Sequence, residues 1–172
     1  INSMSSYKTK LSSINTFIFD VDGVLTDSTV ILDSSGEMVR TMNTRDGFAM
    51  QYAVKNGYNV CIITGGNSPM VKQRLEYLGI NDVYLSATSK TACLEDYINR
   101  KGINLSQVLY MGDDLPDFSV MKQVGLPACP KDAATEILQI AEYVSHYDGG
   151  KGCVRDVIEQ TLRAKGNWPS PS

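Results

Sequence analysis

The stretch "FIFDVDGVLTD", Phe17–Asp27, decides the fold. An apolar run ends on Asp20, Asp22 follows two residues later, and Gly23 precedes further apolar residues. An apolar run rich in β-branched and aromatic residues predicts a buried strand. In open parallel sheets, ligands bind outside the carboxyl ends of the strands. The stretch therefore predicts a strand with a ligand site at its end, and that site explains why the strand ends on clustered carboxylates.

Similar apolar runs recur along the chain, with segments of helical length between them. The predicted strands are residues 16–19, 60–63, 83–85, 108–111 and, more weakly, 125–128. Such alternation favours an α/β fold, a doubly wound parallel sheet with helices on both faces. The segment Ser28–Asn43 breaks the alternation, because two apolar-rich arms flank a Ser-Ser-Gly turn. It predicts a β-hairpin inserted into the sheet fold.

Several predicted helices have readable ends. In "NSPMVKQRLEYLG", Ser68 is a candidate N-cap, Pro69 suits the first helical position, and Gly79 ends the helix. Other helices are predicted from an Asp46 cap to Gly57, after a cap at Asp132, and from about Cys153 to Ala164.

The length and composition of the chain favour one soluble globular domain. The chain has 172 residues, of which 42% are hydrophobic and 20% charged. We predict a single domain over residues 1–172, with a core at 10–165, a hairpin at about 28–43 and a flexible tail at 166–172. The net charge of −3, without a basic run, argues against nucleic acid as a partner.

The sequence offers no membrane or disulfide signal. No apolar stretch approaches the roughly 20 residues that span a bilayer, and the first residues lack the apolar middle of a signal peptide. The four cysteines form no CxxC pair, which favours reduced thiols and a cytoplasmic location. The single histidine, His146, has no GxSxG motif to accompany it, so a Ser-His-Asp hydrolase is disfavoured.

Polar residues follow the predicted strands at the same edge of the sheet. Asp20 ends the first strand, Thr64 ends the next, Lys90 comes shortly after the third, and Asp113 follows the fourth. The acids expected there are Asp20, Asp22, Asp113, Asp114 and Asp117. Because clustered carboxylates repel one another, they should hold a cation, and an all-oxygen set suits Mg²⁺.

This set of residues predicts phosphoryl transfer. The cation, the Thr64 hydroxyl and the Lys90 ammonium together could neutralise a phosphoryl group. Asp20 could attack as the nucleophile, and water would then hydrolyse the aspartyl phosphate. Asp22 could protonate the leaving alcohol and later take a proton from water.

The motifs "DVDGVLTD", "IITGG", Lys90 and "GDDLPD" resemble the four motifs of the haloacid dehalogenase superfamily of phosphatases, over nearly the whole chain. The resemblance implies that Asp20 is the nucleophile, that Asp22 is the acid/base, and that Thr64 and Lys90 hold the phosphoryl group. It also implies Mg²⁺ on Asp20, on the backbone carbonyl of Asp22 and on Asp113. Asp114 and Asp117 would support the metal site.

Two further stretches resemble a narrower group within that superfamily. "NTRDG" at 43–47 and "GGKGCVRD" at 149–156 are similar to the phosphatases of 3-deoxy-D-manno-octulosonate 8-phosphate, a lipopolysaccharide sugar precursor, and of the related nononate 9-phosphate. The substrate-binding residues implied are Asn43, Thr44, Arg45, Asp46, Gly47, Gly65, Arg74 and Arg155. In one departure, octulosonate enzymes often carry arginine directly after "TG", where this chain has Gly66. The resemblance favours the eight-carbon substrate, and this departure keeps the nine-carbon substrate open as the alternative.

No cap domain is expected over the site. Only 41 residues separate Asp22 from Thr64 and 25 separate Thr64 from Lys90, whereas an independent domain needs about 50 or more. Capless relatives form homotetramers in which hairpins pair around a central axis and the glycine-rich tail reaches toward a neighbour's site. The resemblance implies the same assembly here.

Three other functions share part of this pattern. A signalling receiver domain also combines acids, a threonine and a lysine around Mg²⁺, but its motifs come in a different order. A non-catalytic tetramerisation module of the same fold is disfavoured by the intact set of motif residues. A phosphomutase is disfavoured because retaining the phosphoryl intermediate normally requires a cap that excludes water.

Overall fold

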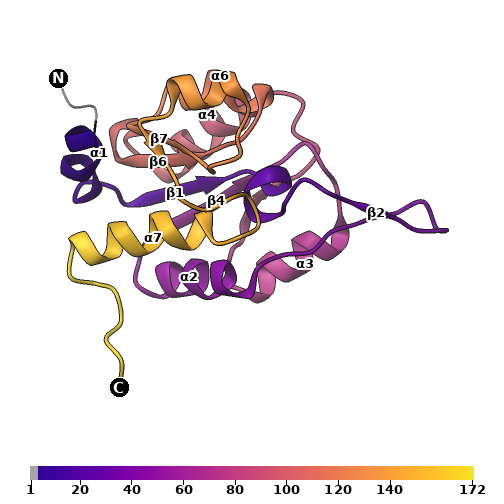
Figure 1. Cartoon of the computed structure of the whole chain (residues 1–172), viewed down its shortest axis with the longest axis horizontal. Coiled ribbons are helices and arrows are strands. Elements are labelled where there is room, and N and C mark those ends of the chain that lie inside the picture. Colours follow the sequence, from indigo (N-terminus) through magenta and orange to yellow (C-terminus); the bar gives the residue numbers. More distant parts are fainter. Residues whose placement is uncertain (1–3) are drawn as a thin grey trace.

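A six-stranded parallel sheet forms the centre of the computed structural model, which describes residues 4–172 (Figure 1). Its strands are β1 (Thr16–Phe19), β4 (Asn59–Ile63), β5 (Asp82–Tyr84), β6 (Val108–Met111), β7 (Leu126–Cys129) and β8 (Tyr143–Val144). Their order is β5-β4-β1-β6-β7-β8, and every neighbouring pair is parallel. The predicted doubly wound sheet is confirmed. A receiver domain would place its first strand differently, in the order 2-1-3-4-5.

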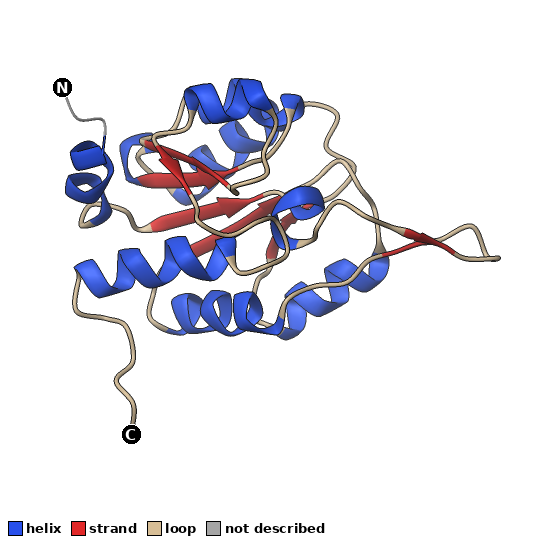
Figure 2. Ribbon diagram, in the orientation of Figure 1, coloured by secondary structure: helices blue, strands red, loops and turns tan. Residues whose placement is uncertain are grey.

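Helices cover both faces of the sheet, as Figures 1 and 2 show. α2 (Thr44–Lys55), α3 (Pro69–Tyr77) and α7 (Cys153–Ala164) lie on one face, and α4 (Lys90–Lys101), α5 (Phe118–Met121) and α6 (Thr135–Ile140) on the other. α1 (Met4–Leu11) precedes β1, and short helical turns span Val21–Leu25, Leu105–Gln107 and Leu115–Asp117. Each face of the sheet has its own hydrophobic core, and successive residues of β1 point to opposite faces. Phe17 and Phe19 pack in the core under α2, α3 and α7, and Ile18 packs in the core under α4, α5 and α6.

The predicted hairpin is present and extends away from the body of the molecule (Figure 1). β2 (Ile31–Leu32) pairs antiparallel with β3 (Met38–Val39), so its ladder is much shorter than the predicted arms. Its side chains are exposed, at 62% for Ile31 and 76% for Leu32. No cap domain lies between the motifs, because the hairpin, α2 and β4 follow Asp22, and α3 and β5 follow Thr64.

Two predicted helix caps are wrong. α2 is capped by Asn43, whose side chain accepts hydrogen bonds from the backbone amides of Arg45 and Asp46. Asp46 is instead buried and accepts a bond from the backbone amide of Arg155. α6 begins at Thr135 without a side-chain cap, and Asp132 accepts a bond from the backbone amide of Gly149.

The N-terminal cap of α3 and the extent of α7 agree with the predictions. Ser68 caps α3, Pro69 is its first residue, and α7 spans the predicted Cys153–Ala164. After α7, Asn167 bonds to the Tyr58 hydroxyl and Trp168 packs against the core. Within residues 4–172, no helix combines the length and apolar character needed to cross a bilayer.

Candidate active site

Asp20 directly follows β1 and begins the turn that forms the base of the site. Its carboxylate accepts a hydrogen bond from the backbone amide of Val21, at 2.7 Å. Gly23, with φ of +88°, lets the turn lie against the loop after β6, because a Cβ there would come within 1.8 Å of the Asp113 Oδ2 atom. The "DVDG" and "GDD" motifs are thereby brought into direct contact.

Lys90 pairs with two carboxylates at the start of α4. Its Nζ lies 3.1 Å from Asp20 Oδ1 and 2.8 Å from Asp117 Oδ1, and all three side chains are largely buried. A cation in the first turn of a helix is disfavoured by the helix dipole, and burial alone would lower the Lys90 pKa. Asp20 and Asp117 outweigh burial and raise the Lys90 pKa. Lys90 is therefore held as a cation beside Asp20.

Asp117 is fully buried, and its carboxylate accepts four hydrogen bonds. Its Oδ1 atom accepts from Lys90 and from the Tyr110 hydroxyl, at 2.8 and 2.6 Å. Its Oδ2 atom accepts from the backbone amides of Asp113 and Asp114, at 3.0 and 3.5 Å. With both oxygens occupied, Asp117 fixes the surrounding groups rather than offering a free ligand atom.

The carboxylates at this edge repel one another. Oxygen atoms of Asp20, Asp113 and Asp117 all lie within 4.8 Å of one another. Burial raises the pKa of Asp20 to about 8 and that of Asp113 to about 7, and repulsion from Asp117 is the second largest cause. A cation would reverse this effect, and Asp20 and Asp113 retain oxygens for it. The all-oxygen donor set fits Mg²⁺.

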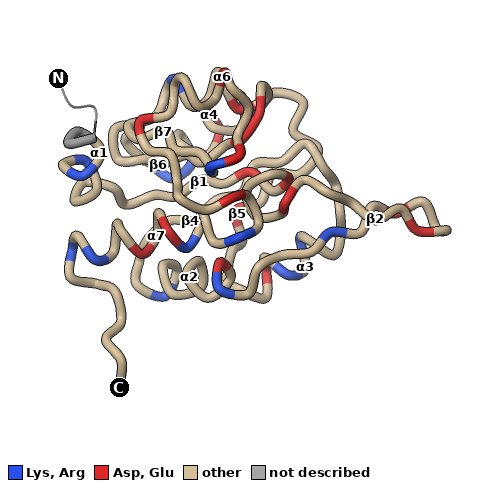
Figure 3. Tube along the Cα trace, in the orientation of Figure 1, with Lys and Arg blue, Asp and Glu red and all other residues tan. Residues whose placement is uncertain are grey.

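A cavity of about 510 Å³ opens on these residues. Thr64 lies at the end of β4, where its backbone amide donates to Tyr84 and its Oγ1 atom accepts from Gly66. The predicted residues that line the cavity are Asp20, Asp22, Thr64, Gly65, Lys90, Asp113 and Asp114. The structure thus brings the four motifs to one place, and Figure 3 shows acidic segments gathered at the edge of the sheet nearest the hairpin.

Arg40 also lines this cavity and was not among the predicted site residues. It lies just after β3, and its guanidinium forms two hydrogen bonds to the carboxylate of Asp22, at 2.7 and 3.1 Å. A signal for it existed in the sequence, since a lone arginine ends the hairpin arm that returns to the body. Only the structure shows that the returning arm places this arginine in the cavity.

Other predicted substrate residues lie elsewhere in the chain. Asn43, Arg45 and Arg155 line a separate cavity of about 420 Å³, together with Tyr147 and Lys151. Thr44 is the first residue of α2. Asn43, Arg45 and Arg155 therefore share one cavity, and none of them lines the cavity that contains Asp20 in the same chain.

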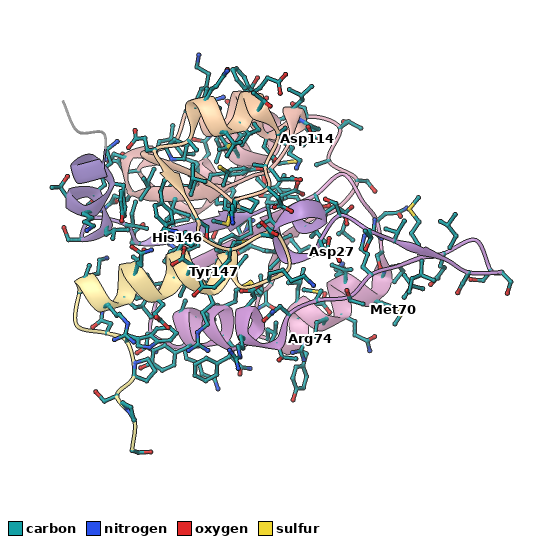
Figure 4. The ribbon with its side chains drawn as sticks, viewed as in Figure 1. Asp27, Met70, Arg74, Asp114, His146 and Tyr147 are labelled. Atoms are coloured by element: carbon teal, nitrogen blue, oxygen red, sulfur yellow. The ribbon has the colours of Figure 1, made fainter. Side chains whose placement is uncertain are left out.

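Arg74 lies on α3, away from the acids of the sheet edge. Figure 4 shows it well separated from Asp114. Its guanidinium lies over the ring of Tyr77, with 5.5 Å between the Cζ atom and the ring centroid. A Cβ on Gly47 would come within 3.3 Å of it, so Arg74 lies beside the start of α2.

The second cavity adjoins the back of the turn after β1. The side chain of Asn43 donates to the carbonyl of Gly150, and the amide of Gly150 donates to the carbonyl of Val24. A Cβ on Gly149 would come within 2.0 Å of the carbonyl oxygen of Gly23. The glycine-rich segment therefore packs backbone against backbone on the "DVDG" turn.

Comparison with known proteins gives consistent matches. The sequence profile of haloacid dehalogenase-like hydrolases matches residues 79–156. The 3-deoxy-D-manno-octulosonate 8-phosphate phosphatase of Salmonella typhi is 37% identical over 158 residues, which are 92% of this chain and 84% of that protein. The Yersinia pestis phosphatase of the same name is 33% identical in its crystal structure, with a TM-score of 0.91 over 93% of this chain and 86% of that one.

A third relative was crystallised with ligands. The Moraxella catarrhalis 3-deoxy-D-manno-octulosonate 8-phosphate phosphatase, in complex with a magnesium ion, a phosphate ion and KDO, is 32% identical. Its TM-score is 0.91 over 95% of this chain and 94% of that chain.

Proposed function

The chain belongs to the family of 3-deoxy-D-manno-octulosonate 8-phosphate phosphatases, within the haloacid dehalogenase-like hydrolases, and we propose that it removes phosphate from that sugar acid. The observation that carries the proposal is the cavity shared by Asp20, Thr64, Lys90 and Asp113. Each of these residues follows a different strand or begins the next helix, so the sheet itself brings them together. The related nine-carbon sugar acid 9-phosphate is the alternative substrate.

We propose a two-step reaction on Asp20. Its carboxylate oxygen attacks phosphorus, so a bond from Asp20 to phosphorus forms while the bond from phosphorus to the sugar oxygen breaks. Asp22 gives its proton to the departing sugar oxygen. Water then attacks phosphorus and loses a proton to Asp22, and the bond to Asp20 breaks to release inorganic phosphate.

Thr64 and Lys90 stabilise the phosphoryl group during both steps. The Lys90 ammonium, held beside Asp20, balances charge on the phosphoryl oxygens, and the Thr64 hydroxyl can donate to them. Asp20, Asp113 and the backbone carbonyl of Asp22 would hold Mg²⁺, which supplies further positive charge when it is bound.

We also propose that the active form is a homotetramer. The exposed apolar arms of the hairpin, Ile31 and Leu32, offer a surface that a neighbouring subunit can cover. A neighbour could also bring Arg45, Arg74 or Arg155 to the catalytic cavity, since none of the three lines the cavity of its own chain. We place the protein in the cytoplasm, where the four free cysteines would stay reduced.

The test is phosphate release from octulosonate 8-phosphate and nononate 9-phosphate with Mg²⁺ present. We expect faster turnover of the eight-carbon substrate, and loss of activity to background in Asp20→Asn, because the attacking oxygen is replaced by an amide. Circular dichroism would confirm that the variant is folded. The proposal fails if the wild type releases phosphate from neither substrate, or if Asp20→Asn stays active.

A further inference from the structure

Arg40 places a guanidinium inside the catalytic cavity, and its side chain is only 9% exposed. Its Nε atom donates to Asp22 Oδ1 at 2.7 Å, and its Nη2 atom donates to Asp22 Oδ2 at 3.1 Å. Its Nη1 atom donates to the carbonyl of Met38 at 3.1 Å. These three bonds fix the plane of the guanidinium against the acid that we place beside the leaving group.

The guanidinium still has donors to spare. It carries five N–H bonds, and the three hydrogen bonds above use three of them. Within the described part of the chain, the other two N–H groups donate to no side chain or backbone carbonyl. Lys90, the other cation of the cavity, is already bound by two carboxylates. Arg40 is therefore the cation best able to bind an additional anion.

Gly66 leaves the space beside these donors open. A Cβ at position 66 would come within 3.3 Å of Arg40 Nη2 and 3.6 Å of Thr64 Oγ1. A larger side chain there would fill the space next to the guanidinium. Because Gly66 has no side chain, the guanidinium of Arg40 keeps free space beside its unused N–H groups.

A third cavity, of about 580 Å³, lies between the hairpin and the start of α3. It shares Met38, Arg40, Gly65 and Gly66 with the catalytic cavity. Glu37 also lines it and contributes a negative charge. Arg40 therefore lies where a ligand would pass from the phosphoryl site toward the hairpin.

We propose that Arg40 is a specificity-determining residue, which binds the carboxylate of the leaving group in the space beside Gly66. The site would then select phosphate monoesters of sugar acids over those of neutral sugars. This inference rests on the proposed phosphatase function. Its chemistry is that of arginine with a carboxylate, in which two parallel N–H donors match two oxygens.

The test compares kcat/KM for an acid and a neutral phosphate ester, 6-phosphogluconate and glucose 6-phosphate. Both carry a primary phosphate ester, so the ratio of the two values cancels effects on phosphoryl transfer. We expect the wild type to prefer the acid by about tenfold or more, the size of a charged hydrogen bond. Arg40→Met should bring the ratio close to one, mainly by raising KM for the acid.

Three further variants separate recognition from folding. Arg100→Met is the matched control, because Arg100 also bonds a carboxylate, Asp82, but lies on the surface and is 48% exposed. It should leave the ratio unchanged. Arg40→Lys should keep part of the preference, because it retains the charge without the paired donors. Gly66→Ala should lower the ratio while Arg40 is intact, so the test survives if Arg40→Met fails to fold.

A binding measurement separates this inference from the proposed function. Gluconate, which has no phosphate, is titrated calorimetrically into wild type, Arg40→Met and Arg100→Met. Weaker gluconate binding in Arg40→Met alone supports the inference even if no phosphate ester is hydrolysed, an outcome that would overturn only the proposed function. Equal losses for acid and neutral esters, no preference in the wild type, or equal gluconate binding would overturn the role of Arg40.

Discussion

At the scale of single residues, Asp117 organises the site through hydrogen bonds, and both of its carboxylate oxygens are already occupied by them. It connects Lys90, Tyr110 and the backbone of Asp113 and Asp114. The sequence predicts Asp20, Thr64, Lys90 and Asp113 at one edge, because strand ends can be read from apolar runs. It could not predict the pair of Arg40 with Asp22, because that pair depends on how the hairpin arm returns.

We predict that Asp117→Asn lowers the free energy of unfolding by about 2–4 kcal/mol, because buried Lys90 loses its closest anion. Reduced repulsion toward Asp20 offsets part of the loss. Urea unfolding without added metal would measure it. Asp82→Asn, which breaks exposed ion pairs with Arg100 and Lys101, is the control and should cost about 1 kcal/mol or less. Equal losses in the two variants would contradict the prediction.

Asp46 should make folding stability depend on pH. Burial raises its pKa from 3.8 to about 6, although the backbone amide and the charge of Arg155 act in the opposite direction. Because the folded state holds this proton more tightly, its contribution to stability is present below about pH 4 and is lost as pH rises to about 6. A difference of about two pH units corresponds to roughly 3 kcal/mol.

Asp46→Asn tests this pH dependence. Its asparagine oxygen can still accept from the backbone amide of Arg155, but the side chain cannot ionise. Relative to wild type, the variant should gain free energy of unfolding between pH 4.5 and 7.5. Urea unfolding across this range would measure the gain, with Glu76→Gln on the exposed side of α3 as control. A constant difference between Asp46→Asn and wild type would contradict the assignment.

At the scale of the elements, long and periodic segments could be predicted and short or tertiary features could not. β1, β6 and α7 have the predicted bounds because their apolar patterns are uninterrupted. β8 has only two residues, too few for a pattern. The start of α2 was misplaced because Asp46, which resembles a cap in sequence, is taken by Arg155 from the far end of the chain.

The cap of α2 gives an element-scale prediction. Asn43→Ala removes the acceptor for the amides of Arg45 and Asp46 and the donor to the carbonyl of Gly150. We expect a loss of about 1–2 kcal/mol in the free energy of unfolding. Asn43→Asp keeps the acceptor and should lose less than half as much. Thermal unfolding of both variants would decide, and equal losses would refute the role of the side-chain oxygen as the cap.

At the scale of the whole molecule, the sequence predicted the sheet, its covering helices, the hairpin and the missing cap domain. The single domain, the flexible tail and the tetramer stay predictions. One sequence does not show which surfaces of two subunits contact each other. The exposed apolar arms of the hairpin suggest where subunits meet.

We predict that the double variant Ile31→Ser and Leu32→Ser converts the proposed tetramer into smaller species and lowers activity. The two side chains are 62% and 76% exposed in the single chain, so their loss should cost the monomer fold little. Light scattering at micromolar concentration would measure the change. Leu138→Ser on α6, also exposed, is the control. A wild type that is monomeric and fully active would sink the prediction.

The contact between Gly149 and Gly23 has a consequence for how mutational data on this protein should be interpreted. A Cβ at position 149 would come within 2.0 Å of the Gly23 carbonyl oxygen, and one at position 150 within 2.7 Å of the Asp27 amide nitrogen. Saturation mutagenesis scored by cell growth would therefore record both positions as intolerant. Both positions would then look like catalytic residues, although the cause would be a steric clash behind the reaction centre.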